Sequence, residues 1–450
     1  MSEKYTYARV IIRGTITTQS PLHIGTGEDY QEKTEDSSVT VNSLALDIHN
    51  KPYIPASTLR GLLRSLCLNT ELKEIIYGTA RQHKEAETTG RSGAMRIYDA
   101  RLQPEQDVSL QIISRTTIDP VTLTAKHHHL STHEQVPTGT VFDLEIHLDK
   151  VNAEAINSII ASLESLATSR IGQGKSTGQG QIKWQLDESQ STLLYRADLS
   201  RWISSSSKTG TLRPASFTRK KYRTKNQSAI KKMTEGLHQS WHSQTMTIIT
   251  DSPLLINDPH AVNKRADEEH APDVIMLKQQ SNAIIPASTL KGWARAQCRR
   301  ILLTMVDGKA EEKIDHLIKQ LFGSTESMSQ LQFTDIVIPK TNYHQHKQTF
   351  IAIDRFTGGV KDGAMCNVEA IEVTQPLTTT IRYRDNLAGW MKILLLYCAR
   401  DAIEGDLVLG WGKSKGFGRL QLQADFNALL AQYDEQQRQV WQAELEEKLA

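Results

Sequence analysis

The chain has 450 residues, with 53 basic and 51 acidic side chains, so its formal net charge at pH 7 is only +2. This balance excludes a uniformly basic protein that coats nucleic acid through bulk charge. No run of the roughly 20 apolar residues that a membrane helix needs is present, and the first residues lack the apolar segment of a signal peptide. We therefore expect a cytoplasmic protein with no membrane partner.

Two short motifs occur twice, in the same order and at nearly the same offset. The sequence PASTL stands at Pro55–Leu59 and again at Pro286–Leu290, so its offset is 286 − 55 = 231. The pattern GxGKSxGxG stands at Gly172–Gly180 and at Gly410–Gly418, so its offset is 410 − 172 = 238. Two motifs repeated in this way indicate a duplicated domain.

The duplication divides the chain into four predicted segments. They are a first domain at residues 1–190, a basic linker at 191–239, a second domain at 240–424 and a C-terminal helix at 425–450. Between Arg213 and Lys232 the linker has eight basic residues, no acidic residue and two interleaved aromatic side chains. Such a stretch can neutralise phosphates and stack on bases, although a solvated basic linker fits the composition equally well. Its candidate RNA contacts are Lys220, Lys221 and Arg223.

The predicted elements have the same order in both halves: strand, helix, strands, helix and strand. Ser57 and Ser288 are suited to cap the first helix of each half. Regions starting at Thr117 and Ala352 are predicted to form long hairpins. This order predicts an α+β fold of two tandem ferredoxin-like domains, each with a hairpin. The polar loops predicted before the first helices are residues 25–43 and 257–273.

The glycine-rich pattern contains a lysine and a serine in both copies. A nucleotide-binding P-loop needs a glycine five residues before its Gly-Lys, and that position holds Ser169 in one copy and Leu407 in the other. Spaced glycines can instead bring backbone N–H groups close to the phosphates of a polymer, whereas a tight helix-to-strand turn is the plain structural alternative. The candidate phosphate contacts are Lys175, Ser176, Lys413, Ser414 and Lys415.

Basic residues follow PASTL in the first turns of the predicted helices. The helix dipole disfavours a cation near a helix N-terminus, but a bound anion reverses that preference. Arg60 and Arg64 share one helix face by their spacing, as do Lys291 and Arg295 in the second copy. These four side chains are candidate anion contacts, and an ordinary exposed basic face is the alternative.

Taken together, these motifs resemble the RAMP superfamily of CRISPR–Cas systems, and most closely the backbone subunits of type III effector complexes, the Csm and Cmr kind. The resemblance rests on SPLHIG at residues 20–25, KPYIPASTLRG at 51–61, IDR at 353–355 and the two glycine loops. It covers nearly all of both halves, as in a fused double subunit. It implies RRM-like palms that grip guide RNA and thumb hairpins that kink the guide–target duplex.

The resemblance also implies cleavage of target RNA by an aspartate in the loop before each PASTL helix. Asp36 and Asp267 stand equally far before Pro55 and Pro286, because 55 − 36 and 286 − 267 both equal 19. These two aspartates are the candidate catalytic and metal-associated residues, with Mg²⁺ as the implied cation and a 2′,3′-cyclic phosphate as the implied product. Arg355 matches the family's hairpin and is a further candidate RNA contact.

Three functions are weighed. The first is a metal-dependent endoribonuclease for antiviral defence that binds guide RNA and complementary target RNA beside other RAMP subunits and the large and small subunits of a type III complex. The second is a non-catalytic structural subunit that binds guide RNA. The third is a RAMP protein that processes precursor guide RNA without metal, in which His127–His129 and His133 would form the site.

Overall fold

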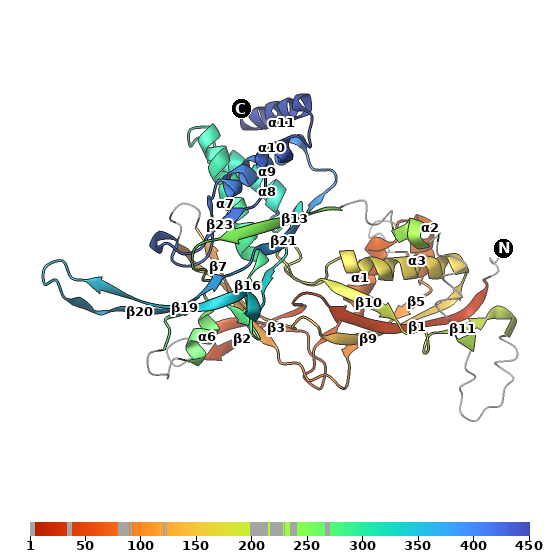
Figure 1. Ribbon diagram of the computed structural model, residues 1–450. Helices are drawn as coiled ribbons and strands as arrows, with labels where there is room; N and C mark the ends of the chain where they lie inside the picture. The colour runs from red at the N-terminus through yellow and green to blue at the C-terminus, as the bar shows by residue number, and fades with distance from the viewer. Residues whose placement is uncertain are drawn as a thin grey trace.

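The structure is a computed structural model, and the residues that it describes are 5–33, 38–79, 90, 92–119, 122, 124–198, 215–216, 228, 230–234, 241–265 and 271–450. In this part of the chain, helices and strands form two domains of the α+β class, which lie beside each other (Figure 1). No helix among the described residues is both long and apolar enough to cross a lipid bilayer.

The sheet of the first domain is built around β1 (Tyr7–Thr18). This strand pairs antiparallel with β9 (Val141–Val151) on one side, and with β10 (Ile182–Leu186) and β11 (Thr192–Tyr195) on the other. Alternate side chains of β1 are buried, as its apolar–polar alternation predicts. The sheet also contains β4 (Tyr53–Ile54), β5 (Met95–Ile97), β6 (Ala100–Leu102) and β12 (Ala215–Ser216). Its helices are α1 (Ala56–Leu66), α2 (Thr70–Tyr77) and α3 (Ala153–Glu164).

The second domain repeats this arrangement around β13 (Trp241–Thr250). The order β10–β1–β9–β5 of the first sheet recurs as β23–β13–β21–β17, with every neighbouring pair antiparallel. The other strands of this sheet are β17 (Leu331–Gln332), β21 (Leu377–Arg384), β22 (Leu407–Val408) and β23 (Arg419–Leu422). The helices are α7 (Ala287–Met305), α8 (Glu311–Phe322) and α9 (Gly389–Ile403). The duplication seen in the motifs is therefore also a duplication of strand pairing.

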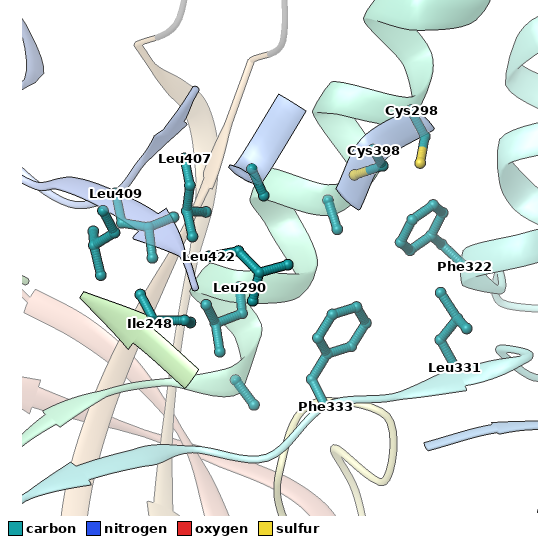
Figure 2. Packing of buried hydrophobic residues seen from close by; sticks show 14 of the residues in the cluster. Ile248, Leu290, Cys298, Phe322, Leu331, Phe333, Cys398, Leu407, Leu409 and Leu422 are labelled. Atoms are coloured by element: carbon teal, nitrogen blue, oxygen red, sulfur yellow. The ribbon is translucent and has the colours of Figure 1, made fainter. Parts of the chain in front are cut away.

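The core of the second domain lies between these helices and the sheet (Figure 2). Phe322 and Phe333 are its largest fully buried side chains. Cys298 and Cys398 bring their thiols together between α7 and α9, and their hydrogen bond and burial raise the pKa of Cys298. The cysteines of the PASTL helices are thus buried apolar residues, as the sequence predicts.

The starts of the two PASTL helices differ from the sequence prediction. Ser57 and Ser288 lie inside the first turn and do not cap the helices, which begin at the preceding alanines. A carboxylate from a distant segment takes the capping role in each case: Asp99 Oδ1 accepts the N–H of Ala56, and Asp335 Oδ1 accepts that of Ala287, both at 2.7 Å. Each PASTL helix is therefore fixed from outside the motif.

Each domain carries a second sheet with a long hairpin. In the first domain it contains β2 (Gly25–Lys33), β3 (Ser38–Leu44), β7 (Gln111–Ile118) and β8 (Ala125–Gln135). In the second domain it contains β14 (Val274–Ile275), β19 (Tyr343–Ile353) and β20 (Val360–Val373). The β19–β20 hairpin reaches away from the body of the molecule (Figure 1).

Two predictions for these regions are wrong. The segment 25–43, predicted as a polar loop, contains the paired strands β2 and β3, because the partner strand satisfies the backbone groups of this charged sequence. In the second copy the corresponding segment contains α6 (Pro259–Lys264). The residues predicted to start the hairpins, Thr117 and Ala352, instead lie at the end of the outgoing strands β7 and β19. The turns follow them, since Asp119 N–H bonds to Thr124 O and Asp354 N–H to Gly359 O.

The domain edges extend beyond the predicted boundaries. β11 lies in the segment predicted as linker, but its apolar residues complete the first sheet along β1. Ile230, near the end of that segment, is buried in the core of the first domain. The predicted single C-terminal helix is two helices, α10 (Phe426–Leu430) and α11 (Glu435–Leu449), and Trp441 of α11 packs into the core of the second domain. The remaining short strands are β15 (Lys278–Gln279), β16 (Asn282–Ile285) and β18 (Ile336–Ile338).

Candidate nucleic-acid interface

The two glycine loops, Gly172–Gly180 and Gly410–Gly418, have the same backbone structure. In both, the first glycine has a positive φ. A Cβ added there would lie 2.2 Å from the carbonyl oxygen that follows a Ser-Pro-Leu sequence, His23 O after residues 20–22 or Leu255 O after residues 252–254. Glycine is thus required because the loop lies directly against that segment. The first glycine of each loop thus serves the packing of the loop against its own domain. The lysine and the serine lie at the tip of the loop.

The first glycine loop contacts the second domain. Lys291 Nζ, on the PASTL helix of the second domain, donates a hydrogen bond to Ser176 Oγ at 2.7 Å. The N–H of Phe333 donates to Ser176 O at 3.2 Å, and Thr177 forms a parallel bridge with Phe333. Two motifs predicted separately, one from each domain, therefore meet in one place.

We call the place where the first glycine loop meets the second domain the junction. Two arginines that the sequence did not predict complete it. Arg170, next to the first glycine loop, donates from Nη1 to Lys175 O at 2.8 Å and to Phe333 O at 2.9 Å. Arg382, on β21, donates to Thr168 O at 2.6 Å. A basic residue two positions before the loop was the available signal for Arg170. Nothing in the sequence links Arg382 to the other domain.

The junction holds more cations than its buried carboxylate can neutralise. Burial lowers the pKa of Lys291 to about 8 and that of Arg170 to about 10. Burial raises the pKa of Asp335, although the N–H of Ala287 and the charges of Arg115 and Arg170 oppose that shift. Burial also lowers the pKa of Arg115, Arg295 and Arg382.

Buried donors at the junction still have bonding capacity. The Nε atoms of Arg115 and Arg170 have no hydrogen-bond partner among the described residues. Partly desolvated cations with free donors bind anions strongly, because a bound anion supplies both the missing charge and the missing acceptors. Arg115 and Arg170 are too buried to meet a polyanion directly, so the groups of the junction that a phosphate can reach are the half-buried Lys291 and the exposed Arg295.

The basic residues of the first PASTL helix have a different role. Arg60 donates to Tyr77 O at 2.6 Å and to Met95 O at 3.3 Å, and Arg64 donates to Gly78 O at 3.0 Å. Both guanidinium groups thus hold the end of α2 against the sheet. Arg60 and Arg64 stand at the positions that Lys291 and Arg295 occupy in the second copy, but they do not make the contacts of Lys291.

The second glycine loop is exposed at its tip. Lys413, Ser414 and Lys415 are exposed and form a short 3-10 turn. Lys415 Nζ lies 4.6 Å from the ring centroid of Phe350 and 4.7 Å from that of Trp411, so the lysine sits against two aromatic rings. This cluster gives the second loop charge and stacking surfaces together.

The tip of the β19–β20 hairpin presents apolar and basic side chains to solvent. Phe356 is 99% exposed and Ile353 is 64% exposed, and the exposed Arg355 lies between them in sequence. Asp354 Oδ1 accepts the N–H groups of Phe356 and Thr357, both at 2.9 Å, and these bonds lower the pKa of Asp354. The turn that displays Phe356 is therefore held by the carboxylate of Asp354, which belongs to the same turn.

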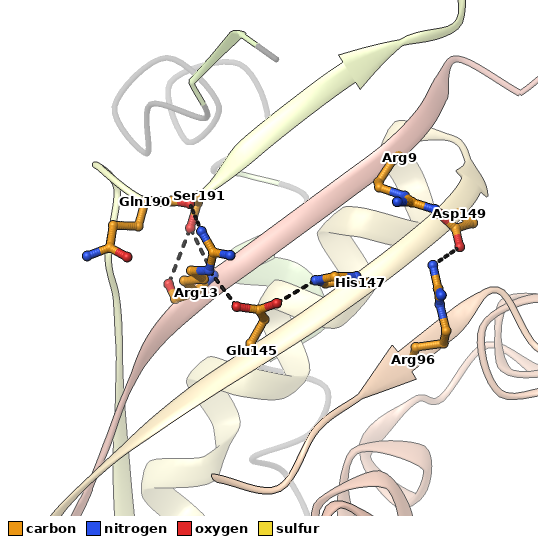
Figure 3. Close-up of polar contacts among 8 residues, drawn as sticks. All are labelled: Arg9, Arg13, Arg96, Glu145, His147, Asp149, Gln190 and Ser191. Atoms are coloured by element: carbon orange, nitrogen blue, oxygen red, sulfur yellow. Dashed lines mark hydrogen bonds and ion pairs between the residues drawn. The ribbon is translucent and has the colours of Figure 1, made fainter. Parts of the chain in front are cut away.

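The open face of the first sheet carries a set of paired charges (Figure 3), in which Asp149 is shared by Arg9 and Arg96. Arg9 pairs with Asp149 at 2.8 Å, and Arg13 pairs with Glu145 at 2.6 Å, directly across the β1–β9 register. His147 also contacts Glu145. Because these cations already have carboxylate partners, this face offers less to an RNA backbone than the junction does.

Both predicted catalytic aspartates, Asp36 and Asp267, lie outside the described residues, as do Lys220, Lys221 and Arg223 of the linker. The strands that follow the acidic segments are placed alike, because β3 pairs in parallel with β8, and β14 pairs in parallel with β20. Each acidic segment thus precedes a strand beside the returning arm of a hairpin. Among the described residues, no three His, Cys, Asp or Glu side chains form a metal-binding group.

The histidine cluster is only partly described. His133 is 6% exposed, its ring contacts that of His23 at 5.2 Å between centroids, and burial with the nearby Arg115 lowers its pKa to about 3. His133 is therefore a neutral interior side chain at physiological pH. The side chains of His127–His129 lie outside the described part of the chain.

Comparison with protein families decides the classification. The model of the RAMP superfamily matches residues 15–183 and 247–421, which is one match for each domain and most of the chain. The chain belongs to the RAMP superfamily. This tandem RAMP protein has both glycine loops and both PASTL helices inside the matched regions, and the family indicates a CRISPR-associated role in RNA binding. Comparison with curated proteins gave no match.

Proposed function

We propose that this tandem RAMP protein is a double backbone subunit of a type III CRISPR effector and binds guide RNA across the junction of its domains. The observation that carries the proposal is the Lys291–Ser176 contact, which unites a motif of each domain in one cation-rich place. Each domain would be a ferredoxin-like palm. Base pairing of the guide, and not the protein, would select the target sequence. The complex would act in the cytoplasm with other RAMP subunits and the large and small subunits.

In this proposal the two hairpins separate the guide–target duplex into segments. The exposed Phe356 at one tip and the 47% exposed Ile118 at the other are apolar wedges of the kind that unstack bases. Arg355 stands next to the first of these wedges and can bind a neighbouring phosphate. A base displaced by a wedge leaves its nucleotide free to rotate about the backbone.

Cleavage would follow from that rotation. The 2′-hydroxyl of the displaced nucleotide attacks its own 3′ phosphorus, a 2′-O–P bond forms and the P–O5′ bond breaks. The hydroxyl proton passes to a general base, and the leaving 5′ oxygen takes up a proton from a general acid. The products are a 2′,3′-cyclic phosphate and a 5′-hydroxyl. We propose Asp36 and Asp267 as the residues that support this step in the first and second domain.

A divalent cation, Mg²⁺ in our proposal, would neutralise charge on the phosphate oxygens when bound. Asp36 and Asp267 are the residues proposed to hold it, since carboxylate oxygens suit this ion. The strands that follow the two acidic segments, β3 and β14, pair in parallel with equivalent hairpin arms, β8 and β20, and this equivalence supports assigning the same role to both aspartates.

The decisive experiment uses the assembled ribonucleoprotein, labelled complementary RNA and Mg²⁺. Asp36→Ala and Asp267→Ala are each expected to remove one distinct cut while target binding stays intact, and the double variant to remove both. Glu35→Ala and Glu268→Ala, at the neighbouring acids, serve as matched controls and should cut normally.

Two other outcomes would assign a different function. Intact binding without any cutting by the wild type would establish a structural subunit. Cutting of precursor guide RNA that persists in EDTA and is lost when His127–His129 are replaced would establish a processing enzyme. Unchanged cutting of target RNA by the double aspartate variant would refute the catalytic assignment.

A further inference from the structure

A buried carboxylate, Glu369, stands near the base of the β19–β20 hairpin and is only 8% exposed. Its Oε2 accepts a hydrogen bond from Arg265 Nη1 at 2.9 Å, and its Oε1 lies 3.2 Å from Lys347 Nζ. Gln345 Nε2 also donates to Oε2, at 3.2 Å. Two cations therefore share one carboxylate, which can neutralise only one of them.

Two more lysines lie beside this group, against the ring of Tyr343. The Nζ atoms of Lys278 and Lys340 are 5.8 and 5.6 Å from the ring centroid. Tyr343 is buried, and its hydroxyl donates to Ser281 O at 2.8 Å, so the ring is fixed in place. Within the described chain, no carboxylate forms an ion pair with either lysine. We call the four cations the basic cluster: Arg265, Lys278, Lys340 and Lys347.

The members of the basic cluster repel one another. Burial lowers the pKa of Lys278, the positive charges of the other three members lower it further, and the charge of Glu369 opposes them. Like charges held together in this way cost free energy, and an anion bound between them removes the cost. Lys340 and Lys347 are exposed, so a polyanion can reach the basic cluster from solvent.

The equivalent carboxylate of the first domain lacks a lysine opposite it. Glu134 matches Glu369, because each stands two residues before the β-bridge to the leucine of a Ser-Pro-Leu sequence. Opposite Glu134 in the strand register stands Ile112, where the second domain has Lys347. An apolar side chain thus takes the place of one cation.

Uncharged donors and an acid replace the rest of the basic cluster in the first domain. Glu134 accepts hydrogen bonds from the hydroxyl of Tyr30 at 3.0 Å and from the N–H of Leu44 at 3.1 Å. Asp47 stands eight residues before its PASTL motif (55 − 47 = 8), where the second domain has Lys278 (286 − 278 = 8). The basic cluster is therefore a feature of the second domain alone, and the duplication of the fold does not account for it.

We propose that the basic cluster binds a backbone phosphate of RNA between Lys278, Lys340 and Lys347, so that the second domain holds the RNA at a point where the first domain does not. A phosphate fits because the site offers charge and N–H donors, whereas the one aromatic ring, that of Tyr343, is buried beneath the lysines. Such a contact positions the RNA and is independent of base sequence. The inference rests on the proposed RNA binding and adds to it a contact made by residues outside the junction.

The test is the salt dependence of RNA binding by the full chain, measured with labelled guide RNA. The double variant Lys278→Gln with Lys340→Gln removes two cations and leaves both ion pairs of Glu369 in place. It is expected to bind roughly tenfold more weakly at physiological salt. The slope of log affinity against log salt concentration is expected to become shallower by about 0.7 for each lysine, which is the contribution of one phosphate contact on a single strand.

Two further double variants separate a phosphate contact from a change of net charge or of fold. Lys278→Arg with Lys340→Arg keeps the charges and should bind as the wild type does. Lys183→Gln with Lys313→Gln, at exposed lysines on β10 and α8, is the charge-matched control and should keep the wild-type slope. Thermal melts of each variant establish that it is folded, and the loss of two mutually repelling lysines should not lower the melting temperature.

The outcomes separate this site from the RNA binding on which it rests. Wild-type affinity and slope in the first double variant would overturn the site and leave binding at the junction in place. An equal loss in the charge-matched control, or arginines that bind as weakly as the glutamines, would also overturn it. A wild type that does not bind guide RNA would overturn both proposals.

Discussion

At the scale of single residues, Lys291 links the charge of the junction to its stability. Burial lowers its pKa to about 8, below the value of 10.5 that it has when exposed. Folding therefore disfavours the protonated lysine, and this group costs stability below pH 8, with relief as the pH rises from about 8 to 10.5. A cation retained at such a cost is expected to serve binding.

Lys291→Met is expected to weaken binding of guide RNA by roughly tenfold at pH 7, since it removes a charged donor to phosphate. The same change should leave stability equal or raise it by on the order of 1 kcal/mol, because a desolvated charge is lost. Affinity of the wild type should fall as the pH rises through 8, and that of Lys291→Arg should not. Titrations of labelled RNA between pH 6.5 and 9.5 measure this, and a flat wild-type profile would contradict it.

The glycines at equivalent loop positions separate backbone strain from docking. Gly178 and Gly416 both have positive φ, +90° and +83°, so alanine costs about 1–2 kcal/mol of strain at either position. At Gly178 the new Cβ would also lie 2.9 Å from Ala287 Cβ and 2.5 Å from Asp335 Oδ1. Gly178→Ala should therefore destabilise the chain clearly more than Gly416→Ala. Urea unfolding measures the loss of stability in both variants. Equal losses would show that the second domain accommodates the new methyl group of Gly178→Ala at no cost.

At the scale of elements, the hairpin tips are built for contact and contribute little to folding. Phe356→Ala should leave the free energy of unfolding within about 0.5 kcal/mol of the wild type, because the side chain is 99% exposed. In the assembled complex the same change should slow one cut of the target RNA. Ile118→Ala, at the other tip, should slow a different cut. Fluorescence of a base analogue at each cut reports unstacking, and unchanged signals in both variants would refute the wedge role.

Elements also show what the sequence could and could not predict. The motifs and the α+β order were readable because repetition and alternation are local signals. The capping of α1 by Asp99 was not, since the carboxylate lies 43 residues away and Ser57 offered a nearer cap. The strand β2 was missed because its charged sequence gives no apolar alternation, and its pairing depends on β3, whose alternating Val39 and Val41 were the available signal.

At the scale of the whole molecule, the two domains form a pair through contacts that duplication alone does not predict. Sequence analysis proposed Lys291 and Ser176 as separate phosphate contacts, one in each domain. Their meeting depends on how one domain docks on the other, and no pattern within either half encodes that. The basic residues that brace α2, Arg60 and Arg64, show the reverse case, in which equivalent positions have diverged in role.

Arg170 is expected to carry much of the coupling between domains. It is 6% exposed, and its guanidinium donates to Phe333 O and to Thr334 Oγ1 of the second domain. Arg170→Leu would leave the buried carbonyl of Phe333 without this donor, which costs about 1–3 kcal/mol. The equivalent residue of the second loop is Val408 (170 + 238), so the arginine stands only at the loop that is enclosed.

Calorimetry of the full chain tests this coupling. We expect the wild type to unfold with the two domains coupled, and Arg170→Leu to separate the melting of the second domain from that of the first. Val408→Leu, at the equivalent position, should melt like the wild type. Limited proteolysis between the domains should accelerate in Arg170→Leu alone. A variant that melts as the wild type does would place the coupling in the Lys291–Ser176 contact and the Arg382–Thr168 bond, which the double variant Lys291→Met with Arg382→Leu would then remove.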